Sequence, residues 1–386
     1  MLNLCLVTWS LTMATTQMLT SNNLAVKKWE NETTIQLMQY TAYGLLAGKG
    51  AIYHPKEIGK GKRGDQTTFA YAGKLTKLPT GEGGVLFSNA EALELNSHSM
   101  TFNVSRFGVQ FPMEDTIEQV RTNVDFDDTS LTVLQRRSKE LLDTSIMYQL
   151  AGAAPTSLSI NGTTYSSASE LLHVQGHNTP VAPSSERIIR AGGAATDQAL
   201  TSSNTFRLDL IDAALEAAHL SNQPLEMFDD GTFALILSPE QATDLKRDSA
   251  GKIQWYANEL AAKQAGAKNN LDGVDMVKGM ISLGRYANVE IYQAPRVAYG
   301  VNGSTSAVIT TVRRAVMVGK NALSFATIFG GSLKDGAIVK YFEQEVDKYY
   351  LLREARMIYG CKKMVPSNKQ DIGVIVISTY SAAHTA

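Results

Sequence analysis

Residues 125–155 read DFDDTSLTVLQRRSKELLDTSIMYQLAGAAP and predict the longest helix of the chain. Asp127 and Asp128 bring capping oxygens and negative charge to its start, and Gly152 and Pro155 end it. Roughly 24 helical residues would span about 36 Å. Apolar side chains recur at helical spacing and predict one buried face, made of Leu131, Leu134, Leu141, Leu142, Ile146 and Leu150. The stretch is either an amphipathic helix over a sheet or a spine that joins a thin domain to a second domain.

Length and composition limit the remaining possibilities. A chain of 386 residues is long enough for two or three domains. The formal net charge of −1 gives no overall field that would attract nucleic acid or an acidic membrane. The two cysteines, Cys5 and Cys361, cannot form a disulfide framework and fit a reducing cytosol. No apolar run reaches about 18 residues, so no membrane-spanning segment is expected.

The first residues, MLNLCLVTWSLT, are mildly apolar but lack a basic region, so they do not predict a signal peptide. Met13 opens a polar segment that reads like a natural protein start. We therefore expect residues 1–12 to be dispensable, because they are too short to form a core.

Residues 56–112 predict a long two-stranded excursion that returns to the start of the long helix. A loop rich in glycine and lysine leads into a strand with Thr68, Phe69 and Tyr71, and LPTGEGG forms a flexible tip before further strands. An isolated hairpin is marginally stable in water, so this one is expected to lean on a partner. An ordinary hairpin within a sheet is the alternative.

The segments on either side of the long helix carry weaker signals. Residues 24–46 predict a helix or two, broken by Gly44, Gly48 and Gly50. Residues 155–204 are rich in small polar residues, and NGTTYSS is expected to turn between short strands.

Residues 205–335 predict a compact α/β unit. Its first helix, over 205–220, is expected to bury Leu208, Ile211, Leu215 and Leu220. The apolar run FALIL predicts a buried strand, followed by a helix with Ser238 at its N-cap. VEIYQAP, SAVITTV and AVMVGKNALSFA are together expected to give strands and one more helix. Residues 336–386 predict a strand, a connecting segment and a final strand that return beside the long helix.

No short motif makes a convincing chemical site. GKGKRG, residues 59–64, matches a dinucleotide-binding pattern, but a strand-like segment follows where a helix is needed. GLLAGKG, residues 44–50, has the wrong spacing for a phosphate loop. The tripeptide RGD, residues 63–65, matches a cell-adhesion motif, but three residues are too few to distinguish from a chance match. The cluster of Lys56, Lys60, Lys62 and Arg63 is better explained by a solvated loop or a subunit contact than by phosphate binding.

His173 and His177 are four residues apart and could share a metal on a helix. Gly176 lies between them and no third ligand is near in sequence. We therefore interpret them as two surface histidines whose replacement by alanine changes stability by less than about 0.5 kcal/mol. No catalytic, cofactor-binding or metal-binding residue is predicted.

Several blocks resemble, in order, the major capsid proteins of N-four-like podoviruses and their relatives. The blocks are AVKKWENET, KGKRGDQTTFAY, ELNSHSMTFNVSRFGVQFP, LQRRSKELLDTSIMYQLAG, SPEQATDLKRD, GVDMVKGMISLGRYANVEIYQAP, AVMVGKNALSFA, ARMIYGCKKM and DIGVIVISTYSAA. The resemblance covers roughly residues 24–382. It departs from the family near KMVPSNKQDIG, where the resemblance implies a Phe-Gly-type turn before the last strand, and 155–204 has no clear counterpart.

The resemblance implies an α+β subunit with the Hong Kong ninety-seven fold of tailed-phage shells. The implied parts are an N-terminal arm (1–55), an E-loop (56–112), a P-domain with the spine helix and a loop-rich insert (113–204), an A-domain (205–335) and a C-terminal return to the P-domain (336–386). Such a protein is a structural component of the virion and not an enzyme.

The resemblance also implies partners. The subunit would form homo-hexamers and homo-pentamers of an icosahedral shell, assembled in the host bacterial cytoplasm. The shell would hold a portal protein, with scaffolding and decoration proteins as further candidates, and enclose double-stranded DNA without sequence-specific binding. No cofactor and no membrane are implied. Two alternatives remain from the residues alone: a cytosolic α/β enzyme built on 205–335, and a phage tail-tube protein.

Overall fold

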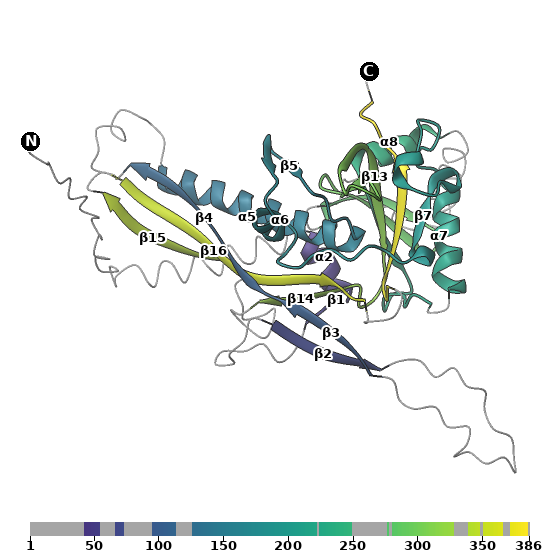
Figure 1. The fold of residues 1–386 in the computed structure, drawn as a ribbon, viewed down its shortest axis with the longest axis horizontal. Helices are drawn as coiled ribbons and strands as arrows, with labels where there is room; N and C mark the ends of the chain where they lie inside the picture. Colours follow the sequence, from purple (N-terminus) through teal and green to yellow (C-terminus); the bar gives the residue numbers. More distant parts are fainter. Residues whose placement is uncertain are drawn as a thin grey trace, which may run out of the picture.

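The computed structural model describes residues 42–54, 66–72, 95–112, 126–221, 224–248, 276–277, 280–327, 339–347, 350–365 and 371–384. In Figure 1 a long helix and the strands beside it form an elongated arm, which joins a compact part built of helices and a larger sheet. A hairpin extends away from both. This mixture of helices and sheets confirms the predicted α+β class.

The long helix, α5, spans Phe126–Ala151 and agrees with the prediction. Its first turn carries Asp127 and Asp128, and it ends before Gly152, which has a left-handed φ of 58°. A Cβ at Gly152 would lie 2.2 Å from the Val181 carbonyl oxygen, so glycine is required there. Five of the six predicted apolar residues are buried and Leu131 is half-buried.

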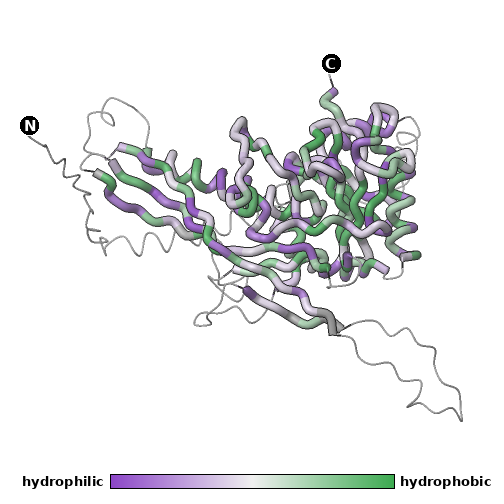
Figure 2. Tube along the Cα trace, in the orientation of Figure 1, coloured by the Kyte–Doolittle hydropathy of each residue, from purple (hydrophilic) through white to green (hydrophobic). Residues whose placement is uncertain are grey.

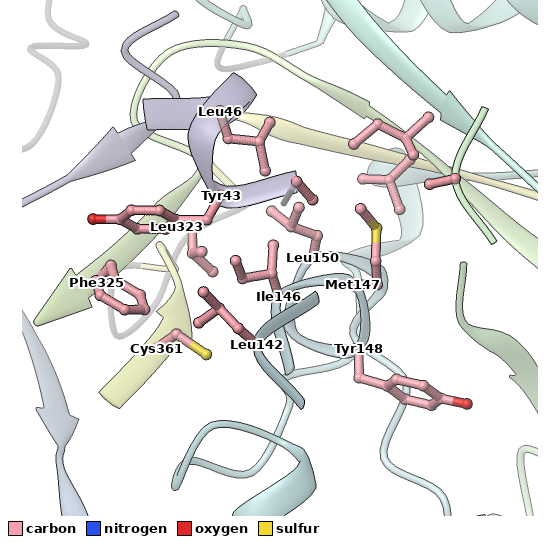
Figure 3. Packing of buried hydrophobic residues seen from close by; sticks show 14 of the residues in the cluster. Tyr43, Leu46, Leu142, Ile146, Met147, Tyr148, Leu150, Leu323, Phe325 and Cys361 are labelled. Atoms are coloured by element: carbon pink, nitrogen blue, oxygen red, sulfur yellow. The ribbon is translucent and has the colours of Figure 1, made fainter. Parts of the chain in front are cut away.

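The arm is one end of a five-stranded sheet. Its strands are β1 (Ile52–Tyr53), β4 (Asn103–Pro112), β14 (Leu323–Thr327), β15 (Val339–Asp347) and β16 (Tyr350–Lys363). The order is β1-β14-β16-β15, and β4 also pairs with β16. Helix α5 covers one face. Leu142 and Ile146 of α5 pack toward Leu323, Phe325 and Cys361 of the sheet (Figure 3).

The compact part contains an eight-stranded mixed sheet in the order β7-β17-β13-β8-β11-β10-β9, with β12 paired to β13. The strands are β7 (Ile188–Arg190), β8 (Phe233–Leu237), β9 (Met276–Val277), β10 (Met280–Tyr286), β11 (Val289–Gln293), β12 (Tyr299–Val301), β13 (Val308–Val318) and β17 (Val374–Tyr380). Hydrophobic residues concentrate in this sheet in Figure 2.

Strand β8 lies between two cores, which explains its unbroken apolar sequence. Phe233, Leu235 and Leu237 pack with α7 (Asp209–Leu220). Ala234 and Ile236, which point the other way, belong to the core that contains α5. The eight-stranded sheet is therefore covered on both faces, and the α5 core is continuous between the two sheets.

Two helices of the compact part can be compared with the helices predicted from the sequence. Helix α8 (Pro239–Arg247) has the predicted cap, because the Ser238 hydroxyl accepts the Gln241 N–H at 3.2 Å and the Gln241 side chain accepts the Ser238 N–H at 3.0 Å. Helix α7 also forms as predicted. Leu220, however, is 76% exposed because it is the last residue of the helix and lies past the sheet.

The connecting segments contain further short elements. They are α2 (Ala42–Gly48), β5 (Leu158–Ile160), β6 (Thr163–Tyr165), α6 (Ala168–Val174) and three 3-10 turns, at Ser185–Arg187, Ala191–Gly193 and Asp197–Ala199. The predicted turn between β5 and β6 is confirmed, with left-handed Asn161 and Gly162. Gly44 does not break its helix: α2 runs through it and packs against α5.

Two segments differ from expectation. The extra helix expected among VEIYQAP, SAVITTV and AVMVGKNALSFA does not form: these stretches contribute to β11, β13 and β14, and β14 lies in the sheet beside α5. In the last segment, β15 and β16 do return beside α5, whereas β17 lies between β7 and β13 in the eight-stranded sheet. The unbroken apolar run of β17 suits a strand that is buried on both faces.

The predicted hairpin is present, with β2 (Gln66–Ala72) antiparallel to β3 (Leu95–Thr101). Its register runs from Gln66 opposite Thr101 to Ala72 opposite Leu95. The tip, 73–94, lies outside the described residues, as does the chain before residue 42.

Candidate functional site at the root of the hairpin

The hairpin meets the rest of the chain at residues 98–102, which we call the root. Thr101 ends β3, Phe102 belongs to no strand, and Asn103 begins β4 opposite Tyr359 of β16. The chain therefore changes its pairing partner from β2 to β16 within two residues. The direction in which the hairpin leaves the molecule is decided at this point.

Asn178 holds the backbone of Thr101 from the side away from β2. Its Oδ1 accepts the Thr101 N–H at 2.9 Å, and its Nδ2 donates to the Thr101 carbonyl at 2.8 Å. The same Nδ2 lies 3.2 Å from the carbonyl oxygens of Gly176 and Cys361. One buried amide thus joins the hairpin strand to β16.

Residues 175–178, which we call the joint, present this amide. Gly176 and His177 both adopt left-handed backbone conformations, with φ of 72° and 63°. A Cβ on Gly176 would lie 2.0 Å from the Cys361 Sγ, so no larger residue fits. Gln149 of α5 donates its Nε2 to the Gln175 and Asn178 carbonyls at 2.6 and 2.5 Å. The joint is therefore fixed to both α5 and β16.

The root also approaches β16 closely. A Cβ on Gly360 would lie 2.3 Å from the Thr101 carbonyl oxygen, so only glycine allows the two backbones to come this near. Met100 and Phe102 form a small buried cluster with Ala326 of β14. These contacts press the base of the hairpin against the five-stranded sheet.

His98, at the β3 end of the root, ties β3 to the same sheet. Its Nε2 lies 3.0 Å from the Ser324 hydroxyl and its Nδ1 lies 3.4 Å from the Val365 carbonyl. Burial lowers the pKa of His98 to about 4, and the charge of Lys362 acts in the same direction. Lys362 itself donates to the Ser99 carbonyl at 2.7 Å.

The structure corrects the interpretation of His173 and His177 as surface residues. His177 is only 7% exposed, and the two rings meet edge to face with centroids 4.9 Å apart. Both reach the Ser105 hydroxyl of β4, from His173 Nδ1 at 3.1 Å and His177 Nε2 at 3.0 Å. Burial lowers the pKa of His177 to about 4, followed by the effect of His173. The pair therefore fastens β4 to α6 and the joint.

The other sequence motifs acquire structural roles or lie outside the described residues. Lys49, in the glycine-rich stretch 44–50, forms ion pairs with Asp230 at 3.0 Å and Glu290 at 2.6 Å. It therefore fixes α2 to the eight-stranded sheet. The motifs at 59–64 and 63–65 and the basic residues from Lys56 to Arg63 all lie outside the described residues.

Buried charges hold both ends of α5. Arg353 of β16 donates to the Asp127 carbonyl at 2.6 Å and the Ser130 hydroxyl at 3.1 Å, and pairs with the Asp127 carboxylate. At the other end, Arg314 of β13 donates to the Ala151 and Gly152 carbonyls, each at 3.3 Å. A cation at a helix C-terminus is favourable. The helix is thus fixed to both sheets.

Within the described ranges, no three His, Cys, Asp or Glu side chains gather as a metal-binding group. No helix in the part of the chain that the structure describes is long and apolar enough to cross a membrane. The polar groups at the root hold segments of the chain together. Sequence patterns did not single out Asn178 or His98, because the contacts that place them at the root reach residues 77 to 267 positions away. Gly176, which lies between His173 and His177, is the one local feature that points to an unusual backbone in this segment.

Comparison with known proteins gives the family. The model of a family described as phage capsid protein matches residues 13–383. No curated protein matches the chain. Among solved structures, the capsid of Ralstonia phage GP4 is similar with a TM-score of 0.67 and 20% identity, over 90% of this chain and 93% of that one.

Two further structures show the same fold. The capsid of cyanophage Pam1 matches with a TM-score of 0.59 and 17% identity, over 86% of this chain and 89% of that one. The head of Helicobacter pylori bacteriophage KHP40 matches with a TM-score of 0.54 and 12% identity, over 82% and 85%. The fold is the predicted Hong Kong ninety-seven type, and these matches do not favour an enzyme or a tail-tube protein. The chain belongs to the phage capsid protein family and is a structural subunit of a virion shell that forms by self-assembly.

Proposed function

We propose that the hairpin is an E-loop that lies over a neighbouring subunit and holds the shell together. The observation that carries this proposal is the exposure of several hairpin residues that the structure describes. Gln66, Thr68, Ala70 and Ser97 are exposed, so these positions bury little against their own chain, unlike His98 and Met100 at the root. A two-stranded hairpin of this kind gains stability when a partner covers it.

The remaining parts have proposed roles in the same scheme. Residues 1–55 form the N-terminal arm and 113–204 the P-domain with α5 as its spine. Residues 205–335 form most of the A-domain, and 336–386 complete the P-domain through β15 and β16. The two segments exchange one strand each. Strand β14 of 205–335 pairs with β16 in the five-stranded sheet, and β17 of 336–386 pairs with β13 in the eight-stranded sheet. Neighbouring A-domains would meet around the centres of capsomers.

The assembled shell would consist of homo-hexamers and homo-pentamers, with a portal protein at one vertex. Scaffolding and decoration proteins are further candidate partners, and assembly would take place in the host bacterial cytoplasm. The net charge of −1 is compatible with a shell that encloses double-stranded DNA without binding it tightly. Placement among the N-four-like podoviruses stays a prediction.

Shortening the hairpin tests this function. Residues 76–86, within the tip that the structure does not describe, would be replaced by a short Gly-Ser turn. The variant should give a soluble subunit with near-normal circular dichroism, because the root contacts remain. It should form no closed particles by negative-stain electron microscopy, or particles that open on mild heating.

A matched control would change the Asn161–Gly162 turn between β5 and β6 to Gly-Gly, which should leave particle formation intact. Normal assembly of the shortened hairpin would contradict the proposed contact between subunits. Failure of the shortened subunit to fold would instead show that the tip belongs to the core of its own subunit.

A further inference from the structure

We infer that Asn178 is a positioning residue that, acting with the His98 and Lys362 contacts at the root, sets the angle of the hairpin and so determines whether subunits fit together. The inference rests on the proposed role of the hairpin as an intersubunit contact. It concerns one amide, which lies at the point where the chain changes from the β2–β3 ladder to the β4–β16 ladder.

The amide of Asn178 takes the place of a neighbouring strand for one residue. It satisfies both the N–H and the carbonyl of Thr101, as a paired strand would, on the side where no strand lies beside β3 among the described residues. Since its Nδ2 also reaches the Cys361 carbonyl, Thr101 is held at a fixed distance from β16. The contact fixes position and orientation together, which a single hydrogen bond does not.

The amide is itself held rigidly. The Asn178 carbonyl accepts from Gln149 of α5, and the Cys361 N–H donates to the Gly176 carbonyl at 3.0 Å. The two consecutive left-handed residues before Asn178 point its side chain at the root. The Asn178 side chain is buried and its backbone is anchored on two elements, so it has little freedom to move. The position of the amide therefore determines the position of the hairpin strand.

A small change of angle at the root moves the far end of the hairpin strand by several ångströms. Strand β3 has seven residues, so its far end lies six steps of about 3.3 Å, or about 20 Å, from Thr101. A rotation of about 10° at the root then moves the far end of β3 by about 3.5 Å. Protein interfaces pack at interior density, so a displacement of this size would separate surfaces that should touch.

The test compares buried amides. Asn178→Ala removes the contact, and Asn178→Asp keeps its shape and Oδ1 but places an oxygen against the Thr101 and Cys361 carbonyls. Gln241→Ala is the matched control, because Gln241 is also buried and donates its Nε2 to Thr379 of β17 at 2.9 Å, far from the root. Spin labels at Thr68→Cys and Arg136→Cys, in a Cys5→Ser background, report the distance from hairpin to helix. Cys361 is buried and stays unlabelled.

We expect all three variants to give folded subunits, with similar losses of melting temperature for Asn178→Ala and Gln241→Ala. The distance between the labels should shift or broaden by several ångströms in both Asn178 variants and stay unchanged in Gln241→Ala. Closed shells should be lost only in the Asn178 variants. An unchanged distance in the Asn178 variants would overturn the inference. It would also be overturned if Asn178 variants failed to fold while Gln241→Ala folded, because the residue would then be required for folding.

The outcomes separate this inference from the function on which it rests. If the label distance shifts and shells still close normally, Asn178 positions the hairpin but the hairpin does not join subunits. If shells are lost equally in Asn178→Ala and Gln241→Ala at unchanged label distance, stability explains the loss and the positioning role is wrong.

Discussion

Lys363 and Asp371 form an ion pair that is sealed from water, with Nζ 2.8 Å from Oδ2 and side chains 0% and 1% exposed. Lys363 ends β16 in the five-stranded sheet, and Asp371 lies just before β17 in the eight-stranded sheet. Burial lowers the pKa of Lys363 and raises that of Asp371, while their attraction opposes both shifts. The pair therefore links the two sheets at a high desolvation cost.

Asp371→Asn should destabilise the subunit by about 3–5 kcal/mol, because it leaves the Lys363 ammonium buried without its counter-charge. Urea unfolding of the free subunit measures the change. The exposed pair of Lys320 and Asp229 provides the control, since solvent screens this pair and Asp229→Asn should leave stability nearly unchanged. Replacing both buried partners, as Lys363→Met with Asp371→Leu, should recover only part of the loss, because the buried Arg187 also loses the attraction of Asp371. Equal small effects at both pairs would show that water reaches Lys363.

Asp143 of α5 should make the subunit less stable as the pH rises. Its Oδ1 accepts the Ala42 N–H at 2.8 Å, and burial raises its pKa to about 7. The folded state therefore holds a proton that the unfolded chain releases near pH 4, so stability from this group falls between about pH 4 and pH 7. Asp143→Asn keeps the acceptor without the charge. Its advantage over the wild type should grow by about 2 kcal/mol from pH 5 to pH 8 in urea unfolding. A constant difference would contradict the raised pKa.

Leu142→Asp should prevent the subunit from folding. Leu142 is 0% exposed in the core between α5 and the sheet, so the substitution buries a carboxylate without a partner at a cost above about 4 kcal/mol. Soluble expression and circular dichroism measure the outcome. Val133→Asp on the same helix is the control, because Val133 is 51% exposed and should tolerate the charge. A soluble Leu142→Asp subunit would show that this face of α5 is not the core.

His177 should weaken the subunit in acid. The pKa of its ring is about 4 in the folded protein and 6.5 when unperturbed, so the unfolded chain binds a proton first. The stability it contributes is present above pH 6.5 and is lost as the pH falls toward 4. His177→Asn removes the titration and tolerates the left-handed backbone, so its melting temperature should fall less steeply over this range. Ser105→Ala, which keeps both rings, should retain the steep dependence.

The buried location of His177 also changes the expectation for replacing both His173 and His177 with alanine. We now expect the free energy of unfolding to fall by about 1–3 kcal/mol, because the Ser105 hydroxyl loses its partners. This replaces the change below about 0.5 kcal/mol that was expected for two surface histidines. An effect below about 0.5 kcal/mol would show that water substitutes for the rings.

Local signals predicted the local structure well. The acidic first turn, the apolar spacing and Gly152 defined α5 to within a few residues, and the Ser238 cap defined the start of α8. These features succeed because a helix and its caps are determined by residues close in sequence. The ordered blocks of sequence then gave the family, although no single motif did.

Long-range pairing explains what the sequence did not reveal. Strand β14 joins the sheet beside α5 through pairs such as Phe325 with Cys361, and no local feature distinguishes this partner from the strands of the neighbouring sheet. Leu220 has the helical spacing of a buried residue but lies past the edge of the core. Asn178 belongs to a polar segment, and its role depends on Thr101, which is 77 residues earlier.

The pairing of β4 with β16 has a mechanical consequence. The ladder runs through ten residue pairs, from Asn103 opposite Tyr359 to Pro112 opposite Tyr350, and it begins directly after the root of the hairpin. Tension on the hairpin therefore pulls β4 along its own axis. Backbone hydrogen bonds in an antiparallel ladder lie perpendicular to that axis, so the force is shared by the whole ladder and does not open it one pair at a time. If the hairpin joins neighbouring subunits as proposed, strain in a shell would load this ladder in shear.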